Sequence, residues 1–412
     1  MALHSISLRL AWRNLWRHKR RTWLTLGAMI FCNLLLAFMV TLQIGSYSMM
    51  IDNTLRSFVG HLQIQQKDYL KDPKMRSVVP EIADVAELAR RALNTQNVAA
   101  RASGFAMASS AERSFGILIT GVQPDFEPKV SSLPGLVTEG RYLATGVHNE
   151  VVIGKLLARN LKVGIGDEIT LMGGGYDGSI AAAIVTVVGI LESGMGELDR
   201  SIAQLSLSDF QEIFAMPGKG HSVVIGAPDL VSVAPWKEKL SAALVDYPGL
   251  VVRDWDELQP GLRQAITADM SSSLFMYLVL VVLVAFSVLN TQLMSVLERT
   301  REFGIMMALG LKPSRLSRLV LIETSLMALL GLCLGVFLGF LLVWYLSLNG
   351  FSYPGMDEMA EKFNMPARIY PELSLLTLLP GPLVVSAGSL LAALYPALRI
   401  FKLQPVEAMR AV

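Results

Sequence analysis

Four long apolar runs alternate with charged segments along the chain. Residues 22–51, 270–297 and 373–398 contain no Asp, Glu, Lys or Arg, and residues 319–348 contain only Glu323. A transmembrane α-helix needs roughly 20 apolar residues to cross roughly 30 Å of hydrocarbon. The pattern therefore predicts four membrane spans, with a long polar segment between the first span and the other three.

The long polar segment, residues 52–269, predicts an α+β domain outside the membrane. Helical periodicity marks residues 81–93 and 234–245, and shorter helices are expected at 155–163 and 208–214. Because each of the two longer helices precedes a strand-like stretch, we expect two lobes. Runs rich in β-branched residues predict strands at 115–122, 150–154, 167–172, 181–191 and 221–227.

The two spans that border this domain are expected to continue beyond the membrane as helical stalks. No helix-breaking residue follows Ile51 before Gly60, and residues 255–269 lead directly into the second span. The glycine-rich stretch 173–178 lies between two predicted strands and indicates a hairpin tip. The predicted fold is a membrane protein with four transmembrane α-helices and a large α+β extracytoplasmic domain between helices 1 and 2.

Residues 1–21 predict a cationic amphipathic helix that lies at the membrane surface. Basic residues recur at helical spacing, and two tryptophans fall on the apolar side. Helices of this kind rest in the membrane interface with the apolar side toward the acyl chains. The alternative is a basic anchor before the first span. The residues assigned to this interface helix are Arg9, Trp12, Arg13, Trp16 and Arg17.

Composition and charge support this arrangement and orient it. The chain is 52% hydrophobic and 17% charged, whereas soluble domains are about 25% charged. Residues 1–21 hold six Lys or Arg and no acid, residues 298–318 hold five against two Glu, and residues 399–412 hold three against one. The loop 349–372 has four acids and two bases. Because basic loops stay in the cytoplasm, we expect cytoplasmic termini and a large domain outside.

The first apolar run could be mistaken for part of a secretory signal. It is longer than the roughly 7–15 residues of a signal-peptide core, so cleavage is not expected. The two cysteines, Cys32 and Cys333, both fall within predicted spans. The outside domain therefore has no disulfide.

The loop 298–318 is unusually apolar for a connection between two spans. Four charges come first, and the nine residues from Phe303 to Leu311 carry none. On a helix these apolar residues would face every side, so one side can rest on neighbouring helix ends while the other needs a cover. Gly310 can end this helix and Pro313 can begin the next. The segment is either a docking helix for a partner protein or a tight interfacial turn.

The third and fourth spans carry further signals. Gly331, Gly335 and Gly339 recur every four residues on one helical face, a spacing that lets helices approach closely. The alternative is an apolar helix that happens to be glycine-rich. Pro380 and Pro382 are expected to distort the fourth helix.

Several kinds of chemistry have no counterpart in the sequence. There is no G-x-x-x-x-G-K-[ST] phosphate loop, and the five histidines have no pair at metal-binding spacing. Glu323 lies near the cytoplasmic edge of its span, so we interpret it as a carboxylate at a helix start or facing the loop. We therefore expect no enzyme, cofactor or metal site in this chain, and energy must come from elsewhere.

The segment 298–310, ERTREFGIMMALG, resembles the coupling-helix signature of the MacB/FtsX-like permease family of ABC transporters. Residues 10–30 resemble the family's N-terminal segment, residues 395–410 its ending, and stretches within 121–194 its outside domain. The overall length and residues 251–266 narrow the resemblance to lipoprotein-releasing transmembrane subunits of the LolC and LolE type. The positions that match the coupling signature are Arg299, Arg301, Glu302, Phe303, Gly304, Ala308, Leu309 and Gly310.

The resemblance implies a permease subunit in the inner membrane of a bacterium. Two such subunits, identical or paralogous, would pair above two ATPase subunits that hold ATP and Mg²⁺. The coupling helix would pass their motion through the spans to the periplasmic domain, which would extract lipoproteins or other lipid-anchored substrates. The residues assigned to coupling are Glu298, Arg299, Arg301, Glu302, Phe303, Gly304, Ile305, Met306, Ala308, Leu309 and Gly310.

Other partners and functions stay open. A periplasmic carrier or adaptor protein is a further candidate partner besides membrane lipids, and no nucleic acid is expected. Drug or peptide efflux with a separate ATPase is one alternative function. Regulation of a periplasmic hydrolase without transport, as in FtsX-like proteins, is another. The sequence identifies neither the substrate nor whether the dimer is with itself or with a paralogue.

Overall fold

The computed structural model describes residues 2–17, 19–357, 360 and 367–404, and of residues 2–7 it describes the backbone alone. The end of the predicted tail, residues 405–412, lies outside the described residues. The chain forms two compact units. One holds the described parts of residues 1–47, 266–353 and 368–412, and the other holds residues 48–265 with the described parts of 354–367.

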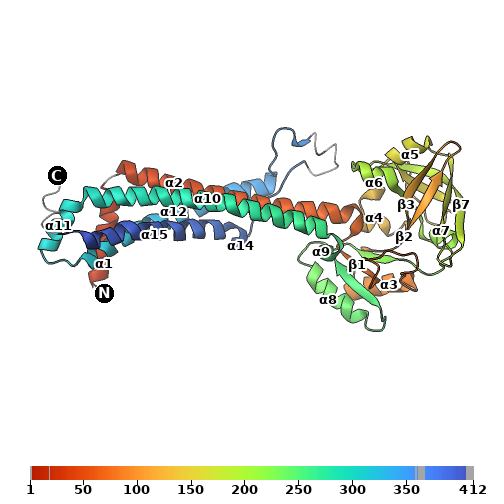
Figure 1. Cartoon of the computed structure of the whole chain (residues 1–412), viewed down its shortest axis with the longest axis horizontal. Helices are drawn as coiled ribbons and strands as arrows, with labels where there is room; N and C mark the ends of the chain where they lie inside the picture. Colours follow the sequence, from red (N-terminus) through yellow and green to blue (C-terminus); the bar gives the residue numbers. More distant parts are fainter. Residues whose placement is uncertain (1, 18, 358–359, 361–366, 405–412) are drawn as a thin grey trace. The chain divides into compact units, whose positions relative to one another are not determined.

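The first unit is a bundle of long helices (Figure 1). Four helical segments of the described chain are long and apolar enough to cross a membrane, namely Lys19–Val59, Pro260–Glu298, Pro313–Asn349 and Leu375–Lys402. The four predicted spans are therefore confirmed. The elements of this unit are α1 (Ala2–Leu15), α2 (Lys19–Thr54, its final residues in the second unit), α10 (Pro260–Glu298, its first residues likewise), α11 (Thr300–Ala308), α12 (Pro313–Asn349), α14 (Leu375–Leu378), α15 (Pro380–Arg399) and the 3-10 turn η3 (Ile400–Lys402).

Helix α2 and the π-turn η1 (Leu55–Val59) form one continuous segment of 41 residues. At 1.5 Å per residue this segment is about 60 Å long, twice the roughly 30 Å of a bilayer core. It ends at Gly60, whose φ of 77° suits glycine. Helix α10 has 39 residues. Both helices thus continue beyond a membrane span, as the sequence predicts.

The fourth span is broken near its start. Helix α14 opens with a capping box at Ser374, and α15 begins at Pro380, with Pro382 in its first turn. Proline is tolerated in the first turn because its missing N–H has no intrahelical partner there. The prolines therefore interrupt the fourth span and start a new helix, so the expected distortion is confirmed and takes the form of a break.

The second unit is an α+β domain with ten strands. Its helices are α3 (Ile82–Leu93), α4 (Glu127–Val130), α5 (Lys155–Leu161), α6 (Gly196–Ser201), α7 (Leu207–Ile213), α8 (Val233–Ala243) and α9 (Trp255–Leu258), with the 3-10 turn η2 (Leu133–Leu136). Its strands are β1 (Leu62–Gln66), β2 (Val98–Ser109), β3 (Ser114–Val122), β4 (Val137–Gly140), β5 (Glu150–Gly154), β6 (Glu168–Gly174), β7 (Ile180–Leu191), β8 (Ile202–Ser206), β9 (Ser222–Ile225) and β10 (Leu250–Asp254).

Four strands and two helices of this domain form a βαββαβ layer. The strands pair in the order β10-β1-β9-β2, and every pair is antiparallel. Helix α3 follows β1 and helix α8 follows β9, and the two helices pack together. Alternate apolar residues of the strands, such as Leu62, Ile64 and Val223, are fully buried in the shared core. This arrangement follows the period of two that a one-faced sheet requires.

Strand β2 and five of the strands that follow it before β9 form a closed circuit of six strands. Strand β2 pairs with β3 and β6, β6 pairs with β7, β7 with β5, β5 with β8, and β8 with β3. Strand β2 is long enough to belong both to this circuit and to the βαββαβ layer. The GGGYDG stretch forms the turn between β6 and β7, so the predicted hairpin tip is confirmed.

The expectation of two lobes, based on the two longer helices, is wrong. Both helices lie on the same four strands, all ten strands are joined in one sheet, and the domain is one compact unit. The five predicted strands are present, but the sequence reading missed β1, β2, β4, β8 and β10. Strand β2, VAARASGFAMAS, is rich in Ala, Gly and Ser, which are weak strand formers.

Candidate coupling site at one end of the helix bundle

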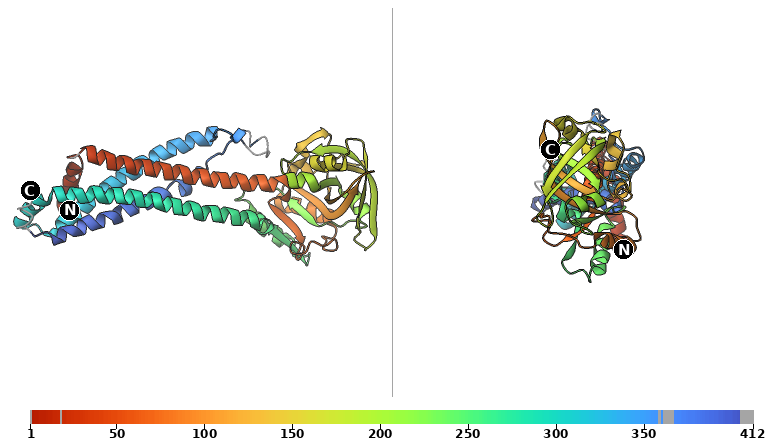
Figure 2. Two further views of the ribbon diagram at one scale, coloured as in Figure 1. Left: turned by 45° about the horizontal axis from the view of Figure 1, so that its top comes forward. Right: turned by 90° about the vertical axis from the view of Figure 1, so that its right-hand side faces the viewer.

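The predicted coupling segment forms a short helix of its own. Helix α11 lies between α10 and α12, at the end of the bundle where α1 and the last described residues of the chain also lie (Figure 2). Gly310 has a φ of 92°, a conformation that side chains other than glycine rarely adopt, and Pro313 is the first residue of α12. Both predicted helix boundaries are confirmed.

One side of α11 is buried against the bundle. Phe303 is fully buried and packs with Val296 of α10, Leu316 and Val320 of α12, and Ile400 of η3. Gly304 is buried beside it. The predicted contact of this helix with neighbouring helix ends is thus present.

The opposite side of α11 is open. Ile305 is 47% exposed and Leu309 is 77% exposed, and Ala308 and Gly310 are exposed as well. Met306 and Met307 are half-buried. Exposed apolar side chains that adjoin one another mark contact sites for other molecules. The segment is therefore anchored on one side and uncovered on the other within the described chain.

A buried polar joint holds the start of α11. Arg299, the residue between α10 and α11, donates hydrogen bonds of 3.1 and 3.2 Å from Nη1 to the two carboxylate oxygens of Glu323 in α12. Asn14 of α1 donates a 2.7 Å hydrogen bond to the same carboxylate. The side chains of Arg299 and Glu323 are 9% and 5% exposed. Removing one partner of a buried pair costs about 3–5 kcal/mol where the other charge is left with no counter-charge, but Arg299 also donates to Glu302 at 3.4 Å.

This joint decides between the two interpretations of Glu323. The carboxylate does not lie at a helix start, because α12 begins ten residues earlier, at Pro313. It faces the predicted loop 298–318, where its partner Arg299 lies, so that alternative is confirmed. It is buried because Arg299 and Asn14 supply donors from two other elements. The signal in the sequence was a single acid in an otherwise apolar run. The identity of its partners depends on the fold.

Two exposed ion pairs surround the joint. Arg17 pairs with Glu302 and Arg21 pairs with Glu298, each at 2.7 Å. Burial alone would raise the pKa of the Glu302 carboxyl, but its hydrogen bond with Arg17 and the nearby charges lower the pKa overall. Exposed pairs contribute little to stability, in the range of about 0–1 kcal/mol. They connect the chain around α1 with both sides of the α10–α11 junction.

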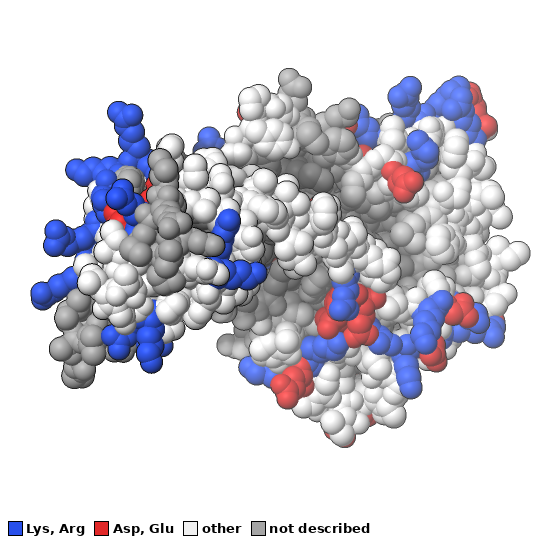
Figure 3. Space-filling view, turned by 60° about the vertical axis from the view of Figure 1, so that its left-hand side comes forward, with Lys and Arg blue, Asp and Glu red and all other residues white. Residues whose placement is uncertain are grey.

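The predicted interface residues lie on and just after helix α1. Ala11 and Leu15 face the bundle and are buried, whereas Trp12 is 45% exposed. The rings of Trp12 and Trp16 meet edge to face at 5.9 Å. Lys and Arg side chains gather at this end of the bundle (Figure 3). The described ones are Arg9, Arg13, Arg17, Lys19, Arg20, Arg21, Arg299, Arg301, Lys312, Arg315, Arg318, Arg399 and Lys402.

The three glycines of α12 face helix α2. A Cβ atom on Gly331 would lie 2.9 Å from Met29 Cβ, and one on Gly339 would lie 3.1 Å from Ala37 Cβ. At Gly335 the distance to Asn33 Cβ would be 2.5 Å. Distances this short leave no room for a side chain, so the two helices approach as closely as their backbones permit.

A polar cluster joins α2 and α10 farther along the bundle. Gln43 donates from Nε2 to Ser273 Oγ at 2.6 Å, and Tyr277 donates to Gln43 Oε1 at 2.6 Å. Tyr47 donates to Asp269, which also accepts from Gln43. The two long helices are therefore cross-linked by side chains close to where each leaves the first unit.

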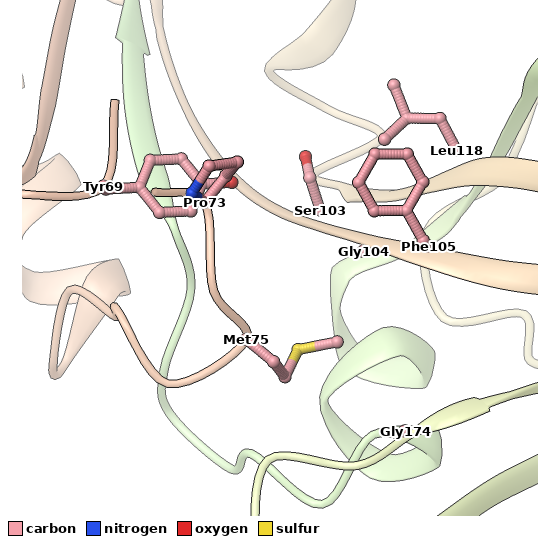
Figure 4. Close-up of a pocket in the computed structure, with 8 residues that line it drawn as sticks. All are labelled: Tyr69, Pro73, Met75, Ser103, Gly104, Phe105, Leu118 and Gly174. Carbon is pink, nitrogen blue, oxygen red and sulfur yellow. The ribbon is translucent and has the colours of Figure 1, made fainter. Parts of the chain in front are cut away.

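The α+β domain has a cleft of about 410 Å³ (Figure 4). Its lining residues are Tyr69, Pro73, Met75, Ser103, Gly104, Phe105, Leu118 and Gly174. Behind the cleft, His221 accepts a hydrogen bond at Nδ1 from the Ser103 N–H, and its Nε2 lies 3.2 Å from Met75 O. Burial lowers the pKa of His221. The lining contains no acid or base, so the cleft suits apolar contact better than catalysis.

Next to this cleft, the outer face of β2, β6 and β7 exposes apolar side chains. Met107 of β2 pairs with Met172 of β6, and both are about half exposed. Phe105, Ile180 and Ile184 on the same strands are 73%, 80% and 59% exposed. This exposed apolar face was not predicted from the sequence, because alternating strands predict one apolar face and not two.

Among the described residues, no three His, Cys, Asp or Glu side chains are grouped as metal ligands. The histidines with described side chains have other partners. His61 lies against Asp52, and His148 lies against Asp209.

The described chain has four candidate spanning helices, with a large domain after the first. Between the second and third lies α11, a short helix with one buried side and one exposed side. This architecture is that of a membrane permease. Comparison with known proteins gives the family. The profile of the MacB-like periplasmic core domain matches residues 22–243, more than half of the chain, and that of the FtsX-like permease C-terminal region matches residues 274–405. The chain belongs to the MacB/FtsX-like family of ABC transporter permeases.

Three relatives illustrate the range of this family. The lipoprotein-releasing system transmembrane protein LolC of Xylella fastidiosa is 27% identical over 315 residues, covering 73% of this chain and 74% of the relative. The corresponding LolE protein of Haemophilus influenzae is 28% identical over 307 residues, covering 71% and 72%. The macrolide export ATP-binding/permease protein MacB of Syntrophobacter fumaroxidans is 30% identical over 161 residues, covering 39% and 20%.

Proposed function

We propose that this chain is the membrane subunit of an ABC transporter and that α11 is the docking helix for a separate ATPase subunit. The observation that carries the proposal is that only one side of α11 is buried. Phe303 lies in the bundle, whereas Ile305 and Leu309 are exposed. A partner that covers the open side would bury this apolar surface. ATP and Mg²⁺ would then be bound by the ATPase, and this chain would supply no catalytic residue.

In this proposal, the orientation of the chain in the membrane follows from the positions of its Lys and Arg residues. The end of the bundle that carries α1 and α11 is rich in Lys and Arg, and such segments stay in the cytoplasm. The chain would therefore lie in the inner membrane of a bacterium with both termini in the cytoplasm and the α+β domain in the periplasm. A second permease subunit, identical or paralogous, would complete the transporter.

The buried joint gives a route for force. Movement of α11 acts on Arg299, and through Glu323 and Asn14 it acts on α12 and α1. Helices α2 and α10, cross-linked near Gln43, continue beyond the length of a membrane span. In this proposal they act as levers that carry the motion to the periplasmic domain.

We propose lipoproteins or other lipid-anchored molecules as the substrates. Support comes from the relatives named for lipoprotein release, which align over more than 70% of this chain. The exposed apolar face around Met107 and Met172 suits a periplasmic carrier or adaptor protein. Efflux of a small molecule is the second candidate, favoured by the match to a macrolide exporter over 39% of the chain.

The docking role is tested by two measurements on the purified complex, namely how much ATPase subunit co-purifies with this chain and how strongly its ATPase activity is stimulated. Ile305→Asp and Leu309→Asp place a charge on the open side of α11, and we expect each to reduce co-purification of the ATPase by at least tenfold, about 1.4 kcal/mol. Ile180→Asp, on an isoleucine 80% exposed in the α+β domain, is the matched control. Equal co-purification and stimulation in all three variants would refute docking at α11.

The substrate is tested separately. Depletion of the protein should leave lipoproteins in the inner membrane while resistance to small toxic compounds stays unchanged. Normal lipoprotein release together with new drug sensitivity would replace the first substrate class with the second. Neither result alters the test of α11.

A further inference from the structure

Helices α1 and α12 enclose an apolar groove near the basic end of the bundle. Its lining residues are Leu8, Arg9, Trp12, Arg13 and Leu326, and its volume is about 310 Å³. The wall is almost entirely apolar, so the two arginines contribute their aliphatic stems. Leu8 is 55% exposed and Trp12 is 45% exposed, and no described residue covers them. A volume of this size is typical of sites for small ligands.

The two arginines at the groove have no carboxylate partner among the described residues. Arg17, Arg21 and Arg299 each pair with a glutamate. Arg9 and Arg13 are four residues apart on one face of α1, where like charges destabilise a helix. A bound anion would relieve that repulsion. The groove thus combines an apolar wall with two cations at its edge.

The depth of the groove matches a membrane interface. Arg318 is the last basic residue before the apolar run of α12. Leu326 follows eight residues later, which is about 12 Å along a helix. Amphipathic helices rest about 5–10 Å into the boundary between headgroups and acyl chains. A lipid that stands beside α12 would therefore have its phosphate near the arginines and its chain along the groove.

We propose that this groove is a binding site for one anionic phospholipid, in addition to the docking and transport functions above. The acyl chain lies against Leu8, Trp12 and Leu326, and the phosphate accepts hydrogen bonds from Arg9 and Arg13. A zwitterionic lipid brings no net charge to the two guanidinium groups. Free phosphate leaves the apolar wall uncovered. The anionic lipid is the occupant that satisfies both parts of the site.

Fluorescence quenching by brominated lipids tests the proposal. The purified full chain is placed in phosphatidylcholine vesicles that contain a small fraction of acyl-brominated phosphatidylglycerol or, separately, acyl-brominated phosphatidylcholine. Subtracting the signal of Trp12→Phe isolates the quenching of Trp12. Because the two arginines attract an anionic headgroup, we expect brominated phosphatidylglycerol to quench Trp12 more strongly than brominated phosphatidylcholine, by on the order of tenfold at low salt.

Variants separate the site from general surface charge. Arg9→Gln combined with Arg13→Gln should abolish the preference. Arg20→Gln combined with Arg318→Gln removes the same charge from exposed positions outside the groove and should keep it. Leu326→Phe fills the groove with both arginines intact and should also abolish quenching, which keeps the proposal testable if the first double variant does not fold.

Three outcomes would overturn the proposal. Equal quenching by the two brominated lipids in the unaltered chain would show that the groove does not select charge. An equal loss in the control double variant would assign the preference to overall surface charge. Loss of the preference on adding inorganic phosphate alone would identify a phosphate site and not a lipid site.

Discussion

Two buried Arg–Glu pairs, one in each unit of the molecule, differ in how firmly they are fixed. In the α+β domain, Arg101 of β2 donates to Glu127 of α4 at 3.0 and 2.6 Å through two nitrogens. At the end of the bundle, Arg299 reaches Glu323 through one nitrogen and also donates to Glu302 at 3.4 Å. The first pair is bidentate, and the second shares one cation between two carboxylates.

The difference separates a pair that is closed within itself from a pair whose arginine is shared. The Arg101 guanidinium also donates to the Phe58 carbonyl and stacks on the Phe58 ring, so it has a carboxylate, a carbonyl and an aromatic ring as partners. Arg299 also lies over an aromatic ring, that of Phe303 in α11. In the proposed function, Arg299 would keep the buried carboxylate of Glu323 while α11 changes its angle and Glu302 moves away. A joint of this kind suits a helix that must transmit motion. The predictions below break or sharpen this comparison, from the largest expected effect to the smallest.

Glu127→Gln should be the most destabilising change. It keeps the shape of the side chain but leaves Arg101 buried without a counter-charge, which costs about 3–5 kcal/mol. Unfolding of the full chain in detergent measures the loss, and hydrogen exchange assigns it to β2 and β3. Unchanged exchange in these strands would show that the pair does not hold the domain.

Glu323→Gln should cost less stability but more function. Arg299 keeps Glu302, and the glutamine can still accept from Asn14, so we expect about 1–3 kcal/mol. Hydrogen exchange should increase in α11 and stay constant in the α+β domain. ATPase stimulation in the complex should fall with it. If stimulation is normal while α11 exchanges faster, the joint does not transmit motion.

Gly335→Ala tests the contact between α12 and α2. The added methyl group would meet Asn33 and the Ile30 carbonyl, and such overpacking typically costs about 1–3 kcal/mol. Gly27→Ala in α2 is the matched control, because a Cβ atom there meets nothing within 4 Å. Thermal unfolding in detergent compares them. Equal melting temperatures would mean that the helices separate freely at this point.

The smallest effect is expected at a pair in the α+β domain that joins an exposed histidine to a buried aspartate. His148 Nδ1 lies 2.6 Å from Asp209 Oδ1, and this hydrogen bond raises the pKa of the histidine above its ordinary value of 6.5. Because the folded pKa is the higher one, the contribution is complete below about pH 6.5 and is lost as the pH rises through the folded pKa. His148→Gln should flatten the pH dependence of melting in that window. A slope equal to that of the unaltered chain would contradict this.

The spans and the five β-branched strands could be predicted because local patterns determine them. Lipid-facing helices must be apolar throughout, and half-buried strands must alternate. Strand β2 escaped prediction because its small residues serve packing. Gly104 of β2 lies against Met75, where an added Cβ atom would come within 2.8 Å of the Met75 methyl carbon. Such contacts come from distant parts of the chain and leave no periodic signal.

The coupling site was predictable in part for the same reason. The apolar run, Gly310 and Pro313 define α11 locally, so its length and boundaries follow from the sequence. For Glu323 the sequence left two alternatives open, because the position of a buried carboxylate depends on donors from elsewhere, here Arg299 and Asn14. The glycines of α12 indicated a close neighbour, but only the fold identifies α2 as that neighbour.

The central claim, that the open side of α11 contacts an ATPase, can be measured directly by photo-crosslinking. A benzophenone side chain at position 309, where Leu309 is 77% exposed, should crosslink to the ATPase subunit in the purified complex. The same group at position 180 in the α+β domain should not. A complex that contains the ATPase but gives no crosslink from position 309 would contradict the account.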